Sequence, residues 1–208
     1  MDVYEALYTT RAMRRCKPDP IPIDAQQRIL DAAIRAPTGG NTQNWRFMLV
    51  DDTDVKTQLG PIYRTCLGQL WETIYKDRLE AARADPSDPE MAQLLRIQRS
   101  AQHLADHFEQ YPLLLFSFVQ FDPTGGSIFP ATWSAMLAAR AEGIGSSLTS
   151  PRKWRAFAAS FACAMFQPAK LLLPTYTTLP CCTRVSIACH TSSQGAARSM
   201  WCIWYRSM

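Results

Sequence analysis

Three arginines close to the start of the chain, Arg11, Arg14 and Arg15, are of a type and spacing that could bind a phosphate. A guanidinium group presents a planar fork of N–H donors, which pairs with two oxygens of one anion. Arginines are also frequent at helix ends, where they lie in solvent. The segment therefore allows either a phosphate site or a solvated basic turn.

A second group of polar residues lies in the segment 36–45, Ala-Pro-Thr-Gly-Gly-Asn-Thr-Gln-Asn-Trp. Gly39 and Gly40 allow backbone N–H groups to approach a ligand closely, and the side-chain amides of Asn41 and Gln43 can pair with the edge of a heterocycle. The alternative is a helix C-cap followed by a polar connection.

Possible metal ligands form weaker patterns. His103 and His107 are four residues apart on an expected helix and could contact one ion, but no third ligand is evident, and a solvated helix face is the simpler interpretation. Cys181, Cys182 and Cys189 lack the paired C-x-x-C spacing of a zinc site. We therefore predict no metal site, and the odd number of seven cysteines argues against a disulfide framework.

The charged residues are distributed unevenly along the chain. None of the 18 Asp and Glu residues follows Glu142, whereas seven of the 22 Lys and Arg residues do. A basic tail with tryptophans could bind nucleic acid or a membrane surface, but without an amphipathic pattern we expect neither partner. The chain has no apolar run long enough to span a membrane. Its start, with Asp2 and Glu5, is unlike a signal peptide, which favours a cytoplasmic location.

The elements that must position these groups are expected mainly in the first 142 residues. Apolar runs bounded by turn residues predict strands over residues 45–50, 112–121 and 146–150. Helical spacing of apolar residues predicts helices over 2–9, 24–36, 53–60, 66–84, 90–108 and 127–142. Many small residues in the segment 129–145 indicate close packing. In the tail, only propensity favours a helix over 156–166 and a strand over 170–179.

In their order along the chain, the segments 9–15, 36–50 and 138–149 resemble the nitroreductase family of flavin enzymes. The resemblance covers about residues 4–150. It implies an α+β fold, with a central antiparallel or mixed sheet flanked by helices, and a homodimer with two FMN sites in its interface. It also implies an oxidoreductase that transfers hydride from NAD(P)H through FMN to a nitroaromatic, quinone or similar acceptor. No side chain need act as acid, base or nucleophile in such an enzyme.

The resemblance assigns FMN contacts residue by residue. The phosphate and ribityl side would contact Arg11 and Arg14, with Ala12 contributing its backbone, and the remaining contacts would lie along the isoalloxazine ring. The residues for this ring are Pro37, Thr38, Gly39, Asn41, Gln43, Leu148 and Thr149.

Two departures from the family pattern bear on the activity. The family often has Ser where Ala12 stands, and nothing after Pro151 resembles its late basic residue or the segment that wraps around the partner subunit. We expect such a tail to leave Trp133, Met136 and Phe118 poorly covered. The alternative function is therefore a noncatalytic or poorly folded nitroreductase remnant that binds flavin weakly or not at all.

The genetic code suggests an origin for the tail. Residues 200–205 are Met-Trp-Cys-Ile-Trp-Tyr. If their codons are read in the frame that begins at the third base of each codon, they encode Val, Val, Tyr or His, Leu or Met, and Val. In the same frame, residues 195–200 permit Arg-Arg-Pro-Leu-Asp, and together these resemble a common nitroreductase ending. We therefore divide the chain into a nitroreductase-like FMN-binding domain, residues 1–150, and an atypical basic tail with Cys and Trp, residues 151–208, derived from a frameshift. A genuine basic extension is the alternative.

Overall fold

The computed structural model describes residues 1–119, 122–149, 185–188 and 198–206, the last two ranges by their backbone alone. The helices are α1 (Val3–Thr9), α2 (Ile23–Ala33), η1 (Gly39–Asn41), α3 (Thr53–Thr73), α4 (Lys76–Ala84), α5 (Pro89–Asp106), η2 (Phe108–Gln110) and α6 (Ile128–Ala141). The strands are β1 (Trp45–Val50), β2 (Leu113–Val119), β3 (Ile144–Thr149), β4 (Val185–Ala188) and β5 (Arg198–Arg206).

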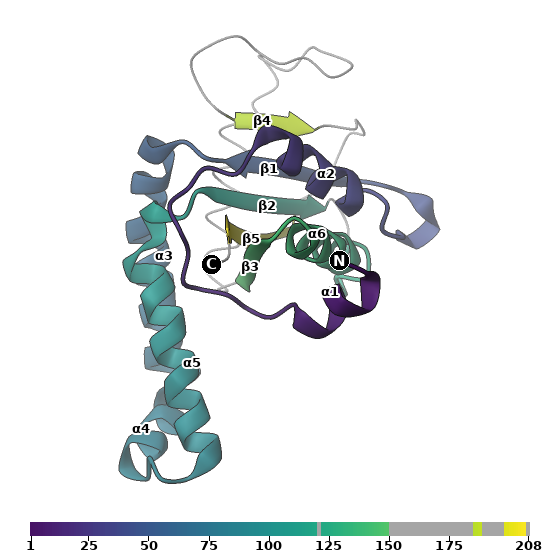
Figure 1. Cartoon of the computed structure of the whole chain (residues 1–208). Helices are drawn as coiled ribbons and strands as arrows, with labels where there is room; N and C mark the ends of the chain where they lie inside the picture. Colours follow the sequence, from purple (N-terminus) through teal and green to yellow (C-terminus); the bar gives the residue numbers. More distant parts are fainter. Residues whose placement is uncertain (120–121, 150–184, 189–197, 207–208) are drawn as a thin grey trace.

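The five strands form one sheet in the order β3-β5-β2-β1-β4, and every neighbouring pair is antiparallel (Figure 1). Strands β1 and β2 agree closely with the predicted strands, because both are apolar runs that are buried along almost their whole length. The sequence did not predict β4 or β5. Strand β5 nevertheless lies inside the sheet, between β3 and β2.

Helices cover both faces of this sheet. Side chains alternate between the two faces of a strand, so that Leu113 and Leu115 of β2 belong to a cluster with α2 and α6. Leu114 and Phe116 belong to a second cluster with α3 and α5. The expected α+β fold with a central antiparallel sheet flanked by helices is therefore confirmed.

Aspartates begin several of the helices. Asp2, Asp52 and Asp88 are the N-caps of α1, α3 and α5, and each side chain accepts a hydrogen bond from the backbone N–H three residues later, at 2.8 to 2.9 Å. Such a bond satisfies one of the N–H groups that a helix leaves unpaired at its first turn. These short polar residues therefore fix where the three helices begin.

Helix α3 differs from the prediction of two helices with a break after residue 60. It runs without interruption through Pro61, which is exposed. Proline removes one backbone hydrogen bond from a helix, but Leu59, Tyr63 and Leu67 are buried on one side of α3, in the cluster with α5. Tertiary packing therefore maintains the helix across the proline. The predicted helix over 66–84 is instead divided between α3 and α4.

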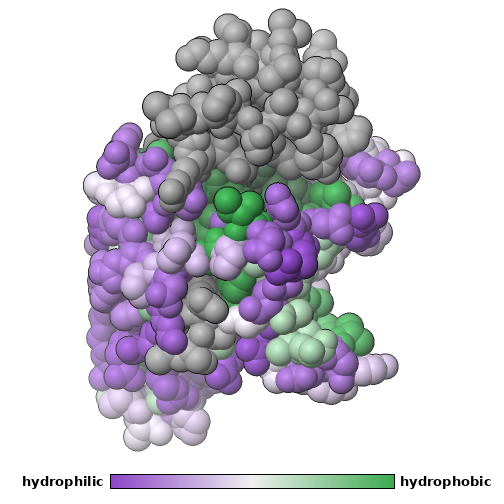
Figure 2. All heavy atoms as spheres, turned by 45° about the horizontal axis from the view of Figure 1, so that its top comes forward, coloured by the Kyte–Doolittle hydropathy of each residue, from purple (hydrophilic) through white to green (hydrophobic). Residues whose placement is uncertain are grey.

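Helices α3, α4 and α5 extend well beyond the sheet as a helical arm (Figure 1). The far end of the arm has a small core of its own around Leu79, Ala82 and Leu94. Figure 2 shows hydrophilic residues over the left side of one face of the molecule and hydrophobic residues near its centre. Among the described residues, no helix is long and apolar enough to cross a membrane.

The expected poor coverage of apolar residues is only partly observed. Met136 and Phe118 are buried, which corrects the prediction for both, whereas Trp133 on α6 is 42% exposed. Phe118 lies in the cluster with α3 and α5, and Met136 lies in the cluster with α2 and α6. The predicted helix over 156–166 and strand over 170–179 lie outside the described residues.

Candidate functional site

The segment that follows α1 is attached to the sheet at its edge strand, β3. Ala12 forms a parallel bridge with Ser146, and the Met13 N–H donates a hydrogen bond to the Ser146 carbonyl oxygen at 3.0 Å. This pairing fixes the backbone between Arg11 and Arg14 beside the strand that carries Leu148 and Thr149.

Arg14 is held by its backbone more firmly than by its side chain. The Tyr111 hydroxyl donates to the Arg14 carbonyl oxygen at 2.7 Å, whereas Arg14 Nη1 lies 3.4 Å from Ser100 Oγ on α5. Arg14 is half-buried, and Arg11 and Arg15 are exposed. Within the described part of the chain, Arg11 makes no hydrogen bond or ion pair. Both Arg11 and Arg14 can therefore offer guanidinium donors to an anion.

Thr149 lies at the end of β3, where its side chain contacts the buried Tyr63. The Tyr63 and Thr149 hydroxyls are 2.9 Å apart. Burial raises the pKa of Tyr63, and the Thr149 hydrogen bond and the positive charge of Arg14 act in the opposite direction. The buried Tyr63 thus holds one of the predicted FMN contacts, Thr149, by a side-chain hydrogen bond. Leu148 packs on the opposite face, against the cluster with α2 and α6.

The loop before β1 adopts an unusual backbone conformation. Gly40, Asn41 and Gln43 have φ values of 60°, 53° and 45°, in the left-handed region that residues with a Cβ seldom adopt. The Gln43 N–H donates to Thr38 Oγ1 at 3.2 Å, and Gln43 Nε2 donates to Asn41 Oδ1 at 2.7 Å. These two bonds hold the loop in this shape.

The same loop presents a donor and an acceptor side by side. The bond between the two side chains uses the Gln43 amide nitrogen and the Asn41 amide oxygen. The Asn41 amide nitrogen and the Gln43 amide oxygen have no hydrogen-bond partner within the described residues. Both side chains are exposed, as is Pro37. An amide donor next to an amide acceptor matches the hydrogen-bonding edge of a heterocycle. The loop therefore has the polar groups that the predicted ring contact would use.

The start of α6 anchors this loop. The Gly39 N–H donates to Ser127 Oγ at 3.3 Å. The Ser127 and Ile128 N–H groups in turn donate to Asp122 Oδ2, both at 2.9 Å. Asp122 is buried, so its carboxylate fixes the first turn of α6 and, through Ser127, the position of the loop.

Residues 11–15, called the arginine segment, and the loop of residues 37–43 lie at opposite corners of the sheet in one chain (Figure 1). Ala12 pairs with Ser146 of β3, and the register of the strands places both level with Leu113 at the start of β2. Trp45, which follows the loop, pairs with Val119 at the end of β2. The two positions are therefore separated by six residues along β2 and by four strand spacings, which is roughly 20 Å in each direction. One chain does not bring all the predicted FMN contacts together.

Tyr63 and Tyr111 were not predicted from the sequence as part of this region. Their partners Thr149 and Arg14 are 86 and 97 residues away along the chain, so no local spacing connects them. The one available signal was the presence of a polar aromatic residue in an otherwise apolar pattern. A buried tyrosine usually needs a partner for its hydroxyl.

Two other groups of titratable side chains lie near the arginine segment. The rings of His103 and His107 are 4.1 Å apart, and burial, followed by the charges of His107 and Arg15, lowers the pKa of His103. Lys56 is buried and donates to the Tyr111 carbonyl oxygen at 2.9 Å, and burial lowers its pKa. No group of three or more possible metal ligands occurs among the described residues.

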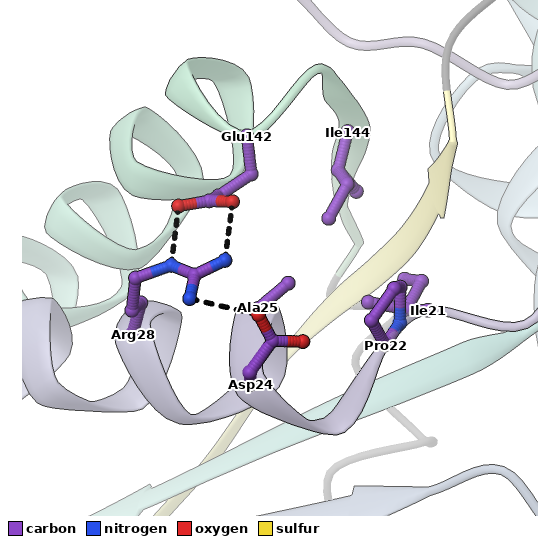
Figure 3. A pocket seen from close by; sticks show the side chains of 7 residues that line it. All are labelled: Ile21, Pro22, Asp24, Ala25, Arg28, Glu142 and Ile144. Carbon is purple, nitrogen blue, oxygen red and sulfur yellow. Dashed lines mark hydrogen bonds and ion pairs between the residues drawn. The ribbon is translucent and has the colours of Figure 1, made fainter.

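A small cavity of about 160 Å³ lies away from the predicted site residues, between α2 and the start of β3 (Figure 3). Arg28 donates two hydrogen bonds to Glu142, at 2.7 and 2.8 Å, and one to Asp24 at 2.9 Å. Ile21 and Ile144 form part of the lining. The one guanidinium of this cavity is thus already paired with two carboxylates.

Comparison with known proteins identifies the family. The chain matches the Nitroreductase family over residues 7–164, which is more than half of its length. Iodotyrosine deiodinase 1 of Rattus norvegicus is 30% identical over 83 residues, which are 36% of this chain and 29% of that protein. The chain thus aligns with less than a third of this curated relative.

Solved structures share the fold along nearly the whole chain. Oxidized iodotyrosine deiodinase bound to FMN and 3-iodo-L-tyrosine superposes with a TM-score of 0.64 at 17% identity, over 99% of this chain and 89% of that one. The FMN-dependent nitroreductase NfnB from Mycobacterium smegmatis in complex with NADPH gives a TM-score of 0.57 at 17% identity, over 98% and 86%. The sequence match and the shared architecture lead to one conclusion: the chain belongs to the nitroreductase family.

Proposed function

We propose that the protein is an FMN-dependent oxidoreductase that uses NADH or NADPH to reduce a nitroaromatic, a quinone or a similar acceptor. One observation carries the proposal: the structure gathers Arg14, Ala12 and Thr149 beside β3 and presents the loop 37–43 as an exposed donor and acceptor surface. Two similar solved structures also support it, because one is bound to FMN and the other is in complex with NADPH.

The residues present fit FMN. The exposed guanidinium of Arg11 and the half-buried guanidinium of Arg14 suit its phosphate, while Asn41 and Gln43 suit the polar edge of its ring. FMN, when bound, supplies the ring that accepts and donates hydride. Arg14 would neutralise the phosphate, and the loop would orient the ring by hydrogen bonds. Thr149 would lie against the ring from the end of β3.

We further propose that the site is completed by a second copy of the chain. The arginine segment and the loop lie too far apart to meet in one copy, but a two-fold axis can bring the loop of one copy to the arginines of the other. The exposed apolar residues of α1 and α6 support this arrangement, because such surfaces favour association. They are Val3, Tyr4, Leu7, Tyr8, Phe129 and Trp133.

The purified chain is titrated with FMN, and flavin absorbance measures how much FMN is bound. Size-exclusion chromatography measures the oligomeric state. We expect a yellow dimer with one FMN per chain that oxidises NADH or NADPH when a nitroaromatic or quinone is present. 3-Iodo-L-tyrosine is included among the acceptors because a similar solved structure contains it. A folded, colourless chain that binds no FMN would support the noncatalytic remnant instead.

A further inference from the structure

Two buried tyrosines direct their hydroxyl groups at residues that the proposed function assigns to FMN. Tyr111 is fully buried and donates to the Arg14 carbonyl oxygen at 2.7 Å. Tyr63 is 2% exposed, and its hydroxyl lies 2.9 Å from Thr149 Oγ1. The rings belong to the cluster between the sheet and the helices α3 and α5. Each hydroxyl therefore connects the core to a residue at its margin.

Backbone pairing also holds the chain at both partners: Thr149 pairs with Trp201 of β5, and the Met13 N–H, next to Arg14, donates to Ser146. Arg14 lies in the irregular connection between α1 and α2, and Thr149 is the last residue of β3. The Arg14 side chain has only a long contact of 3.4 Å with Ser100, which is near the limit of a hydrogen bond. The hydroxyl of Tyr111 is thus the shortest described contact that Arg14 makes.

Both tyrosines are themselves held firmly. Lys56 Nζ donates to the Tyr111 carbonyl oxygen at 2.9 Å, and Lys56 is buried as well. The Tyr63 ring stacks on Phe108, with centroids 4.9 Å apart. A group that must present a ligand contact within a fraction of an ångström requires such rigid support from behind.

We propose that Tyr63 and Tyr111 are positioning residues for FMN, which fix Thr149 and the Arg14 backbone from the buried side of the sheet. The inference rests on the proposed function, and it adds two residues that do not touch the flavin. It requires that the loss of either hydroxyl weakens FMN binding through its partner, while the ring continues to fill the core.

A double-mutant cycle on Tyr111 and Arg14 tests the first half. Removing one uncharged hydrogen bond by Tyr111→Phe should weaken FMN binding about fivefold in the otherwise unchanged chain. The same substitution should have less than about a twofold effect in Arg14→Ala, because the side chain through which it acts is gone. An equal effect in both backgrounds would overturn the role of Tyr111.

A second cycle pairs Tyr63→Phe with Thr149→Val, which removes the partner hydroxyl at similar volume. We expect the two substitutions together to weaken FMN binding no more than the stronger one alone. Tyr75→Phe is the matched control, because Tyr75 precedes α4 in the helical arm and packs against its small core, away from the arginines and from α1. Additive effects in this cycle would overturn the role of Tyr63.

Hydrogen exchange of the flavin-free protein separates this inference from the proposed function. Tyr111→Phe should increase exchange at residues 12–16 and leave the strands β1 and β2 protected. A global loss of protection would make the hydroxyl a requirement of the fold and overturn its positioning role. If the wild-type chain binds no FMN, the proposed function fails and this inference fails with it. If the wild type binds FMN but the cycles are additive, only the inference fails.

Discussion

Arg14 shows how one residue can be fixed and available at the same time. Its carbonyl oxygen accepts a short hydrogen bond from Tyr111, while its guanidinium has only the contact at 3.4 Å with Ser100. Because the side chain is half-buried, part of its hydration is already lost before an anion arrives. A phosphate oxygen can therefore replace Ser100 at little cost in protein contacts.

Substitution of Arg14 should affect FMN binding directly. We expect Arg14→Ala to weaken it by about 1.5 to 3 kcal/mol, the range for a hydrogen bond to a charged group, and Arg14→Lys to recover only part of the loss. FMN titration followed by flavin fluorescence gives the affinity. Arg83→Ala, on exposed helix α4, is the control. Equal affinity in wild type and Arg14→Ala would remove Arg14 from the site.

The ion pair between Arg64 and Glu109 should make stability depend on pH. Arg64 donates to both carboxylate oxygens of Glu109, at 2.7 and 3.1 Å, and this lowers the pKa of Glu109 below its ordinary value of 4.5. The stabilisation is present above pH 4.5 and is lost as the pH falls through the lowered pKa.

Urea unfolding of wild type and Glu109→Gln between pH 3 and 7 measures this dependence. At pH 7 we expect wild type to be more stable by less than about 1 kcal/mol, because the pair is partly exposed and screened. The difference should disappear at the acid end. Glu80→Gln, on exposed α4, should show no such change. A constant difference across the whole range would contradict the assignment to this ion pair.

At the scale of elements, α3 shows where tertiary contacts override local sequence. Proline at position 61 costs the helix one backbone hydrogen bond, and the packing of Leu59, Tyr63 and Leu67 compensates. The side chain of Pro61 itself is exposed and contributes nothing to that packing. The helix therefore contains a local defect that substitution can remove.

Pro61→Ala should stabilise the protein. We expect the free energy of unfolding to rise by about 1 to 3 kcal/mol, since alanine restores the missing N–H and suits a helix interior. Denaturant unfolding followed by circular dichroism provides the measurement. The control is Pro86→Ala, in the turn between α4 and α5, where no helical hydrogen bond is gained. An unchanged or reduced stability of Pro61→Ala would show that the proline fits α3 without strain.

The elements also show what sequence could predict. The strand at Trp45–Val50 was predicted to the residue, because an uninterrupted apolar run between polar turns has one simple interpretation. The continuity of α3 was not predictable, because it depends on buried contacts rather than on the local Gly60-Pro61 pair. Strand β5 was missed although residues 200–205 form a similar apolar run, because the tail as a whole shows no clear helical or strand period. The site residues that the sequence predicts lie in local motifs, whereas Tyr63 and Tyr111 contact partners 86 and 97 residues away and carry no local signal.

At the scale of the whole molecule, the tail of residues 151–208 differs in composition from the rest of the chain. We propose that residues 1–150 are the FMN-binding domain and that residues 151–208 derive from a frameshift near residues 149–153. The composition supports this, because the tail contains no Asp or Glu. The family match ends at residue 164, within the tail.

Restoring the reading frame from about codon 150 should improve the protein. We expect the frame-restored chain to melt at a higher temperature and to contain more FMN per chain than the 208-residue product, because a family-like end would cover the site and the partner subunit. Thermal melting and flavin absorbance of both purified proteins give the comparison. Equal melting temperatures and equal flavin content would identify the tail as a functional extension. The gene must also contain an open frame that continues the family pattern beyond codon 150.

The position of β5 has a consequence for how the chain is made. Strand β3, which carries Thr149 and anchors Ala12, reaches β2 only through β5, and β5 consists of residues 198–206. A ribosome that has synthesised the first 150 residues has therefore produced both the arginine segment and the loop, but not the strand that joins β3 to the rest of the sheet. The hydrogen bonds that join β3 to the rest of the sheet can therefore form only after residues 198–206 have been synthesised.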